Sequence, residues 1–349
     1  MTFSIETIHS VAQYDPVLWD QLGRHEPFTS HKWYLFAETV LQKDTPLYII
    51  VSKDQQPVGR AAFWVKREEA LPVTSLVGKL GINLLFKLWP LMICQSPMAN
   101  AGGLILPDSD QRAVVFDLIM EEAAKQMGEY KASFLVLDFM TRSDAEHLRF
   151  EGNLVPVELP EQGTYLNILW NNFEGFISNL SAKERKNYRQ NRNKAAKLGV
   201  QIRVMERSPA IEETMALIAA HDKSYRTPVN PWTESMLEYS HLVNSVWIGA
   251  YVGEKLVGCG LLLEDNGSWV ATAMGRDYDY PYVYFVIGYE SIKYVIENGG
   301  GILRWGTGAY QYKKRLGFQL EDTNFVSFMA GNKLVHTLLE KFAGQLVKI

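Results

Sequence analysis

Two stretches of the chain, 200 residues apart, share one pattern. Tyr48–Val65 and Ile248–Asp265 each contain an apolar run, a short polar turn, a Val-Gly pair and a second apolar run. This order is typical of a β-hairpin whose glycine, Gly59 or Gly258, lies just inside the return strand. A repeat of this length predicts a duplicated structural unit.

The residues around each hairpin extend the parallel. A helical pattern precedes each hairpin, and an amphipathic helix, a short strand and a final strand follow it. The first copy has helices at Ser30–Leu41 and Ala113–Gln126 and strands at Ser133–Asp138 and Tyr165–Trp170. The second has helices at Ile211–Tyr225 and Phe285–Asn298 and strands at Gly301–Trp305 and Asn324–Met329. The order predicts an α/β (α+β) fold of two similar domains, each with its own final strand.

The boundary between the copies is expected where turn-forming residues gather. Pro156, Pro160 and Gly163 lie between the first helix-strand set and the next strand. Turn residues of this kind separate elements and domains. We therefore expect an N-terminal domain at 1–163 and a C-terminal domain at 164–349, each a mixed, mostly antiparallel sheet flanked by helices.

Composition limits the class of protein. The chain of 349 residues is 47% hydrophobic and 21% charged, which excludes a disordered or low-complexity chain. Its two cysteines, Cys94 and Cys259, cannot form a disulfide framework and favour a reducing compartment. The N-terminus lacks the basic and apolar regions of a signal peptide, so a cytoplasmic location is expected.

The most apolar stretch is Leu71–Cys94. Lys79, Lys87 and two prolines interrupt it, so a membrane-spanning helix is not expected. Within it, residues 76–93 have two interpretations: a core strand and helix of the first domain, or an apolar channel or membrane-facing patch for a lipid-linked substrate.

A basic helix is predicted at residues 181–198. Ser181 and Glu184 have the spacing of a capping box, and Gly199 provides a C-terminal stop. Seven of the chain's 35 lysines and arginines fall between Lys183 and Lys197. Such a run is usually a solvated face; alternatively it binds phosphates, for which the arginine fork is suited.

Three segments resemble one family. Pro27–Trp33, Phe173–Arg189 and Trp305–Phe318 are similar, in this order, to the FemAB-like branch of the GNAT superfamily. The resemblance implies two tandem GNAT-like domains and an N-acyltransferase, with the acyl or aminoacyl group supplied by acyl-CoA or aminoacyl-tRNA. It implies direct attack by the acceptor amine, without a covalent enzyme intermediate.

The resemblance also implies site residues in the second domain. Arg185 and Arg189 match the family motif and are expected to bind substrate, with Tyr188 and Trp305 beside them. Lys313, at the matching distance from Gly317 and Phe318, is expected to stabilise the developing oxyanion, with Tyr310 and Tyr312 as further catalytic residues. The alternative is that Lys313 and Lys314 only make the end of a short helix soluble.

Other site classes find little support. The histidines and cysteines show no metal-ligand spacing, so no metal is expected. The acetyl-CoA loop of GNAT enzymes has no match at Met274–Pro281, which is aromatic, and the donor stays open between acyl-CoA and aminoacyl-tRNA.

The partners expected are a small-molecule, nucleotide-linked or lipid-linked amine acceptor, a tRNA acceptor end, a peripheral membrane contact through 76–93, and no DNA. The main hypothesis is an N-acyltransferase, with cell-envelope or polysaccharide metabolism as the pathway considered. The alternatives are a non-catalytic recognition or scaffold protein of a cell-envelope system and a nucleic-acid-binding protein that uses the 183–197 helix; a sequence pI near 6.0 argues against the last.

Overall fold

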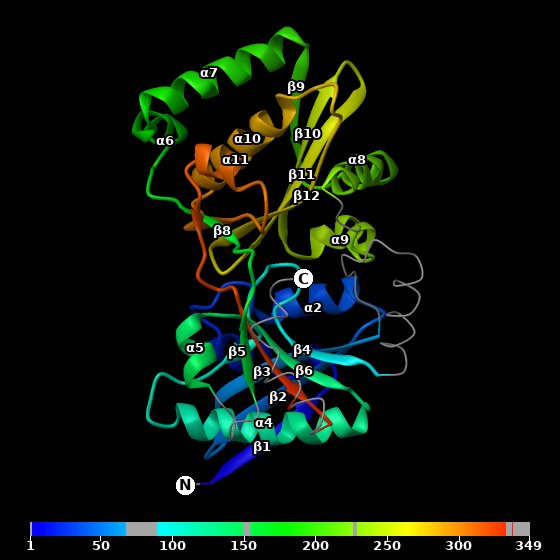
Figure 1. Cartoon of the computed structure of the whole chain (residues 1–349), viewed down its shortest axis with the longest axis vertical. Helices are drawn as coiled ribbons and strands as arrows, with labels where there is room; N and C mark the ends of the chain where they lie inside the picture. The colour runs from blue at the N-terminus through cyan, green and yellow to red at the C-terminus, as the bar shows by residue number, and fades with distance from the viewer. Residues whose placement is uncertain (1, 68–88, 149–153, 226–228, 333–336, 338–349) are drawn as a thin grey trace. The chain divides into compact units, whose positions relative to one another are not determined.

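The computed structural model describes residues 2–67, 89–148, 154–225, 229–332 and 337. Its described residues form two compact units. The first unit holds those up to Gln162 together with those from Glu321 on, and the second unit holds Gly163–Leu320. Each unit is built on one mixed, mostly antiparallel sheet flanked by helices, as expected (Figure 1).

The first unit's sheet has the strand order β1-β2-β3-β4-β6-β15-β7, with β5 paired to β3. Among its described strands, only β4 and β6 pair in parallel. Its strands are β1 (Phe3–Ile8), β2 (Thr45–Lys53), β3 (Gln56–Lys66), β4 (Leu91–Cys94), β5 (Leu104–Ile105), β6 (Phe134–Met140), β7 (Val155–Glu158) and β15 (Phe325–Ala330). Its described helices are α1 (Pro16–Leu22), α2 (His31–Val40), α4 (Arg112–Glu129) and α5 (Arg142–His147).

The second unit's sheet, in the order β9-β10-β11-β12-β13-β8-β14, repeats that arrangement position by position. Here β12 and β13 form the parallel pair. Its strands are β8 (Thr164–Asn167), β9 (Val200–Met205), β10 (Asn244–Val252), β11 (Lys255–Asp265), β12 (Ser268–Arg276), β13 (Ile302–Arg304) and β14 (Gln319–Leu320). Its described helices are α6 (Phe173–Asn179), α7 (Ala182–Lys197), α8 (Ile211–Ser224), α9 (Thr233–Tyr239), α10 (Val283–Glu297) and α11 (Tyr310–Arg315).

The two hairpins occupy equivalent places. In β2–β3 the register shifts just after Val51, which pairs with Gly59, and in β10–β11 it shifts just after Ala250, which pairs with Gly258. Glycine is needed at both positions for the same reason. A Cβ atom would collide with a valine Cγ1 of the covering helix, which is Val115 of α4 in the first unit and Val283 of α10 in the second. The hairpins therefore confirm the predicted duplication.

One expectation about the strands is wrong. The sequence predicted that each copy ends in its own strand, but β8 pairs with β13 of the second unit and β15 pairs with β6 and β7 of the first. The two final strands are thus exchanged between the sheets. Local sequence cannot distinguish the two arrangements, because either strand offers a sheet a short apolar segment. The expected change of domain near residue 163 coincides with the entry into β8, whereas the residues from Glu321 on return to the first unit.

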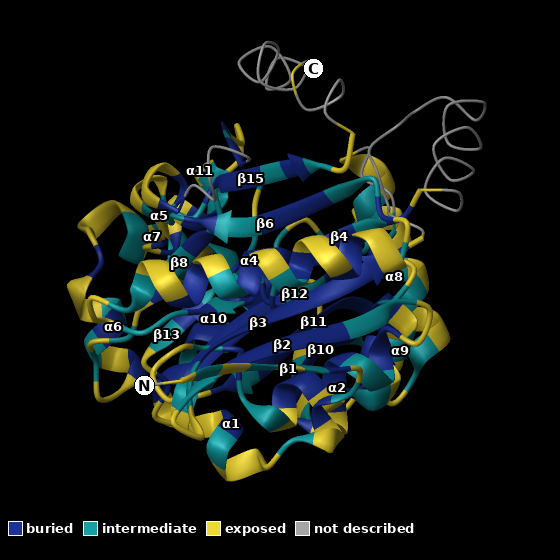
Figure 2. Cartoon of the chain, turned by 90° about the horizontal axis from the view of Figure 1, so that it is seen from below, coloured by how far each residue is buried: buried dark blue, intermediate teal, exposed yellow. Residues whose placement is uncertain are grey.

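The hydrophobic cores lie between each sheet and its helices. Figure 2 shows β2 and β3 buried along most of their length, while one side of α4 is exposed. The buried side of α4 contributes Val115, Phe116, Ile119 and Met120. The corresponding core of the second unit is formed around Val283, Ile287 and Ile292 of α10. Of the apolar stretch 76–93, the last residues form β4 with Cys94, and residues 76–88 lie outside the described residues.

Candidate functional site

Lys313 lies on α11, the short helix that follows the turn after β13. Its side chain is almost fully buried, with 2% exposed. The ammonium donates hydrogen bonds to three main-chain carbonyl oxygens, those of Trp305 at 2.5 Å, Gly306 at 3.0 Å and Thr307 at 2.9 Å. Since an ammonium has three N–H donors, these carbonyls can use all of them. In this structure Lys313 therefore holds the turn, and its oxyanion role stays a prediction.

A side chain of β8 also forms hydrogen bonds with this turn. The Thr164 hydroxyl donates to the carbonyl of Trp305 at 2.6 Å and is 3.2 Å from that of Gly306. Ala309, at the N-cap of α11, has the left-handed φ of 49° and provides no side-chain cap. The buried ammonium of Lys313 instead orders the turn before the helix, through the carbonyl oxygens of Trp305, Gly306 and Thr307.

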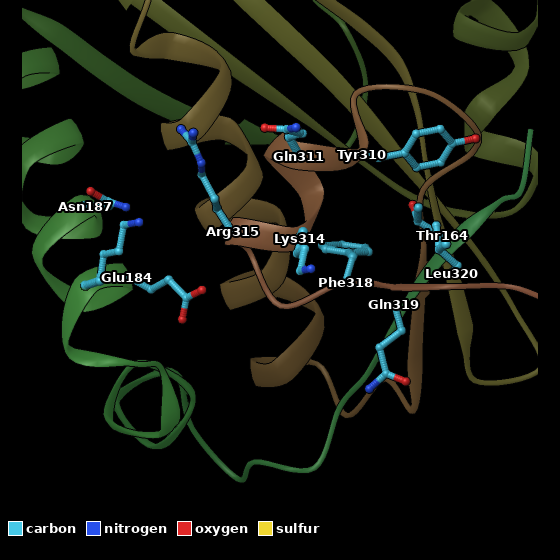
Figure 3. Close-up of a pocket in the computed structure, with 11 residues that line it drawn as sticks. Thr164, Glu184, Asn187, Tyr310, Gln311, Lys314, Arg315, Phe318, Gln319 and Leu320 are labelled. Carbon is cyan, nitrogen blue, oxygen red and sulfur yellow. The ribbon is translucent and has the colours of Figure 1, made fainter.

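An open pocket of about 900 Å³ lies beside α11, within the second unit. Figure 3 shows its wall on one side formed by α7, with Glu184 and Asn187, and on the other by α11, with Lys314 and Arg315. The lining residues are Thr164, Lys183, Glu184, Asn187, Tyr310, Gln311, Lys314, Arg315, Phe318, Gln319 and Leu320. Of the pair Lys313–Lys314, the second contributes to this pocket.

The charge of the pocket lining is positive. Lys183, Lys314 and Arg315 are exposed cations, and Glu184 is the only acidic residue among the lining residues. Its carboxylate accepts a hydrogen bond from the Ser181 main chain at 3.1 Å, so it completes the predicted capping box of α7. The pocket is therefore suited to an anionic ligand.

The family-motif residues of α7 lie outside this lining. Arg185 donates through Nη1 to the carbonyl oxygens of Ser178, at 3.0 Å, and of Leu180, and so joins α7 to the end of α6. Arg189 is exposed. Tyr188 packs edge-on against Phe173 and Tyr289, with ring centroids 5.9 and 4.7 Å apart, and so anchors the helix. The substrate-binding roles of these three residues stay predictions.

A second group of side chains surrounds the ring of Tyr284, and we call it the Tyr284 cluster. It consists of His221, Arg276, Tyr284, Trp305 and Tyr312. His221 and Trp305 stack on Tyr284 at centroid distances of 5.9 and 5.5 Å, and Tyr312 meets it edge-on at 4.2 Å. The Arg276 guanidinium carbon is 5.7 Å from the Tyr284 centroid.

Three polar atoms of the Tyr284 cluster are buried without a hydrogen-bond partner among the described residues. They are Nδ1 of His221, Nε of Arg276 and the hydroxyl oxygen of Tyr312. Buried polar groups in native proteins nearly always have partners, and unpaired ones concentrate where a ligand or an ordered water completes the site. Burial, assisted by the charge of Arg276, lowers the pKa of His221 to about 4, so its imidazole is neutral at pH 7.

The topology of the sheet explains where this cluster lies. β12 and β13 pair in parallel only from Ser268 to Val270, whereas β12 continues to Arg276. Past the paired part, Ala273 has a left-handed φ of 49° at a register shift in β12. The carboxyl ends of neighbouring parallel strands are a common location of binding sites in α/β proteins.

Only part of this cluster could be predicted from the sequence. Trp305 and Tyr312 were expected at the site, whereas His221, Arg276 and Tyr284 were missed. Arg276 could have indicated this site, because it is the one arginine in the aromatic segment Met274–Pro281, where the acetyl-CoA loop of GNAT enzymes was expected. Its partners come from α8, α10 and α11, and no local pattern joins them.

No group of three or more His, Cys, Asp or Glu side chains is placed to hold a metal ion among the described residues. No helix in the described part of the chain has the length and apolar character needed to cross a membrane.

Comparison with known proteins places the chain in a family. Residues 10–346 match the FemAB-like family model, which is described as peptidoglycan biosynthesis/recognition. The chain belongs to the FemAB-like family. This confirms the expected FemAB-like branch, and no curated protein matches the sequence.

Solved structures support the fold assignment. FemX is 12% identical, with a TM-score of 0.65, and the alignment covers 96% of this chain and 100% of FemX. A tandem GNAT protein from the clavulanic acid biosynthesis pathway is 9% identical, with a TM-score of 0.54 and coverage of 95% and 99%. L-PGS from Bacillus licheniformis is 11% identical, with a TM-score of 0.52 and coverage of 98% of both chains. At these identities the likeness concerns the fold alone, and it confirms two tandem GNAT-like domains.

Proposed function

We propose that this protein is an aminoacyltransferase that moves an aminoacyl group from aminoacyl-tRNA to an amine of a cell-envelope peptide. The family, whose description is peptidoglycan biosynthesis/recognition, supports the class of reaction. The observation that carries the choice of donor is the surface of α7. That helix presents six exposed cations: Lys183, Lys186, Arg189, Arg192, Lys194 and Lys197.

None of these six forms an ion pair with a carboxylate of the described residues. Arg192 donates to the Tyr188 hydroxyl at 3.3 Å, and Lys194 lies 5.1 Å from the ring centroid of Tyr282. A dense set of cations without ion pairs fits a polyanion with regularly spaced phosphates. Lys183 also lines the anionic-ligand pocket, so the two positive surfaces are continuous at the start of α7.

The turn between β12 and α10 supports the same donor. This turn has the sequence Asp277-Tyr278-Asp279-Tyr280, in which aspartates and tyrosines alternate. The Asp277 carboxylate accepts from Lys255 at 2.7 Å, and this hydrogen bond lowers the pKa of Asp277. The same segment, Met274–Pro281, also lacks the R/Q-x-x-G-x-G/A loop with which GNAT enzymes bind acetyl-CoA, which weakens the case for a coenzyme A donor.

The reaction requires few catalytic groups. The neutral acceptor amine attacks the ester carbonyl of the aminoacyl group, the C–N bond forms and the C–O ester bond breaks. The amine proton passes to the leaving ribose oxygen. The neutral imidazole of His221 can accept a hydrogen bond from the amine, although its lowered pKa makes it a weak base, and the Tyr310 hydroxyl can donate a hydrogen bond to an oxygen atom of the reacting ester.

Binding and transfer of a radiolabelled aminoacyl group to amine-bearing peptides test the proposal. We expect charged tRNA to bind with an affinity that falls steeply with salt, and coenzyme A to leave the melting temperature unchanged. Replacing Lys186, Arg189 and Lys194 together by Gln should reduce the salt dependence of tRNA binding. The matched control replaces Lys125, Lys223 and Lys293, which lie on other helices.

Two results would contradict the proposal. Stabilisation by acyl-CoA together with transfer from it would make the donor a thioester. Binding of charged tRNA without transfer to any amine would instead favour the recognition role.

A further inference from the structure

Arg276 is a cation without an acidic partner among the described residues. No ion pair joins it to a described carboxylate, although Lys255 on the neighbouring strand β11 and Arg203 on β9 of the same sheet both have one. Its guanidinium lies between two aromatic rings, 4.5 Å from the centroid of Tyr278 and 5.7 Å from that of Tyr284. A partly buried charge in such surroundings is costly unless something compensates it.

The groups around Arg276 are also unsatisfied. Its own Nε, the Tyr312 hydroxyl and Nδ1 of His221 are buried and have no partner in the described part of the chain. The positive charge of Arg276 acts on both neighbours: it adds to the effect of burial in lowering the pKa of His221, and it opposes the effect of burial in raising the pKa of Tyr312. Two donors, Nε–H and O–H, and one neutral imidazole thus share a positive environment.

We propose that Arg276 and Tyr312, beside His221, bind a carboxylate of the acceptor substrate. This proposal rests on the proposed function and names the acceptor as an amine that also has a carboxylate, such as an amino acid or a peptide end. The guanidinium can give parallel N–H bonds to the two carboxylate oxygens, and the Tyr312 hydroxyl gives a third bond to one of them. The flat ring faces of Tyr278 and Tyr284 suit a planar group.

The surroundings of Arg276 differ from those of the exposed cations that we propose bind phosphates, and this difference supports a separate acceptor site. The cations of the 900 Å³ pocket and of α7 are exposed lysines and arginines, which are suited to phosphates in solvent. Arg276 instead has aromatic neighbours and one guanidinium charge, which a single carboxylate neutralises. His221, within the same cluster, is neutral at pH 7, so its ring does not repel an incoming amine.

The test measures binding without any transfer. Ligand-detected NMR and thermal shift are recorded with N-acetylglycine, with its neutral amide N-acetylglycinamide and with inorganic phosphate. We expect N-acetylglycine to bind in the millimolar range and the amide at least 10-fold more weakly. Arg276→Gln should weaken binding of N-acetylglycine about 10-fold or more, and Tyr312→Phe about 3-fold, as expected for loss of one hydrogen bond.

Arg203 provides the matched control. It also lies over a tyrosine ring, with its guanidinium carbon 4.2 Å from the centroid of Tyr251, but it is paired with Glu254 at 3.2 Å. Arg203→Gln should leave N-acetylglycine binding unchanged. Should Arg276→Gln fail to fold, Tyr312→Phe and Arg276→Lys carry the test, because a lysine retains the charge and loses the planar fork.

Three results would overturn the proposal: equal binding of acid and amide, tighter binding of phosphate at the same place, or no effect of Arg276→Gln in a folded protein. Transfer activity separates this proposal from the previous one. A protein that transfers aminoacyl groups but does not bind N-acetylglycine refutes the carboxylate site alone, whereas carboxylate binding without transfer refutes the proposed function.

Discussion

The two units of this protein share a strand order but differ at the positions that could carry chemistry. The hairpin glycines place Val115 of α4 and Val283 of α10 in equivalent positions, so Tyr284 corresponds to Phe116, which is buried in the first core. The helices α5 and α11 have six residues each and both end before a buried leucine, Leu148 or Leu316. By that alignment Lys313 corresponds to Ala145, which is 1% exposed.

The same alignment places Asp144 opposite Tyr312. Asp144 accepts from the hydroxyl of Thr141 at 2.9 Å and pairs with Arg112 at 3.0 Å, so it is part of an ordinary capped helix. Thr141 caps α5 with its side chain, whereas Ala309 cannot cap α11. The fold therefore does not require a buried lysine or unsatisfied polar atoms at these positions. Their presence at these positions of the second unit supports our proposal that this unit holds the site, although the first unit also buries cations, Arg60 and Lys66, at other positions.

The largest effect is expected from Lys313→Met, which removes the feature that most separates the units. Three main-chain carbonyls would lose their donor, and we expect a loss of about 3 kcal/mol in the free energy of unfolding, as for leaving buried hydrogen-bond acceptors unpaired. Chemical denaturation with far-UV circular dichroism measures it. Lys314→Met is the matched control: Lys314 is exposed, and its replacement should change stability by no more than about 0.5 kcal/mol.

This pair of variants also tests the oxyanion role expected for Lys313. If Lys313→Met keeps the wild-type stability but lowers kcat by about 10²-fold or more, the ammonium acts on the reacting group and the turn does not need it. A large loss of stability would support the turn-holding role that the hydrogen bonds indicate.

The next effect tests the equivalence of the hairpins. A methyl group at Gly59 or Gly258 would collide with Val115 or Val283, and β-branched valines have little freedom to move. We expect Gly59→Ala and Gly258→Ala each to cost about 2 kcal/mol, within the range for overpacking. Thermal and chemical denaturation measure both.

Gly128 on α4 is the control for these glycines, since a Cβ atom there would have no neighbour within 4 Å. Gly128→Ala should stabilise the protein by about 0.5–1 kcal/mol through helix propensity. A marked difference between the Gly59 and Gly258 variants would mean that the two helix–hairpin contacts are not equivalent.

The features that sequence predicted are those set by neighbouring residues. The hairpin glycines, the capping box of Ser181 and Glu184, and the helix that it begins depend on short-range patterns, and the structure has all of them. The exchange of β8 and β15 depends on long-range pairing between segments of similar character, so no pattern in either segment shows it. The burial of Lys313 could not be predicted, because a lysine is usually exposed. The carbonyls that accept its hydrogen bonds come from a turn whose path the sequence does not give.

The smallest expected effect concerns Asp222, the residue after His221 on α8. Burial raises the pKa of Asp222 from its ordinary value near 3.8 to about 6, so the folded protein favours the protonated acid. The ionised form therefore costs stability, and this cost appears as pH rises from about 4 through 6. Asp222→Asn, which cannot ionise, should be more stable than the wild type by about 1 kcal/mol at pH 7.5, a value reduced because the side chain is half-exposed. The gain should disappear below about pH 4.

His221 acts in the opposite direction, because its lowered pKa makes stability fall as pH drops below 6.5, and both proteins share that slope. The difference between the two denaturation curves across pH 4–8 isolates Asp222. If the difference in stability between Asp222→Asn and the wild type stays constant over this range, the Asp222 carboxyl has an ordinary pKa and its place on α8 does not raise it.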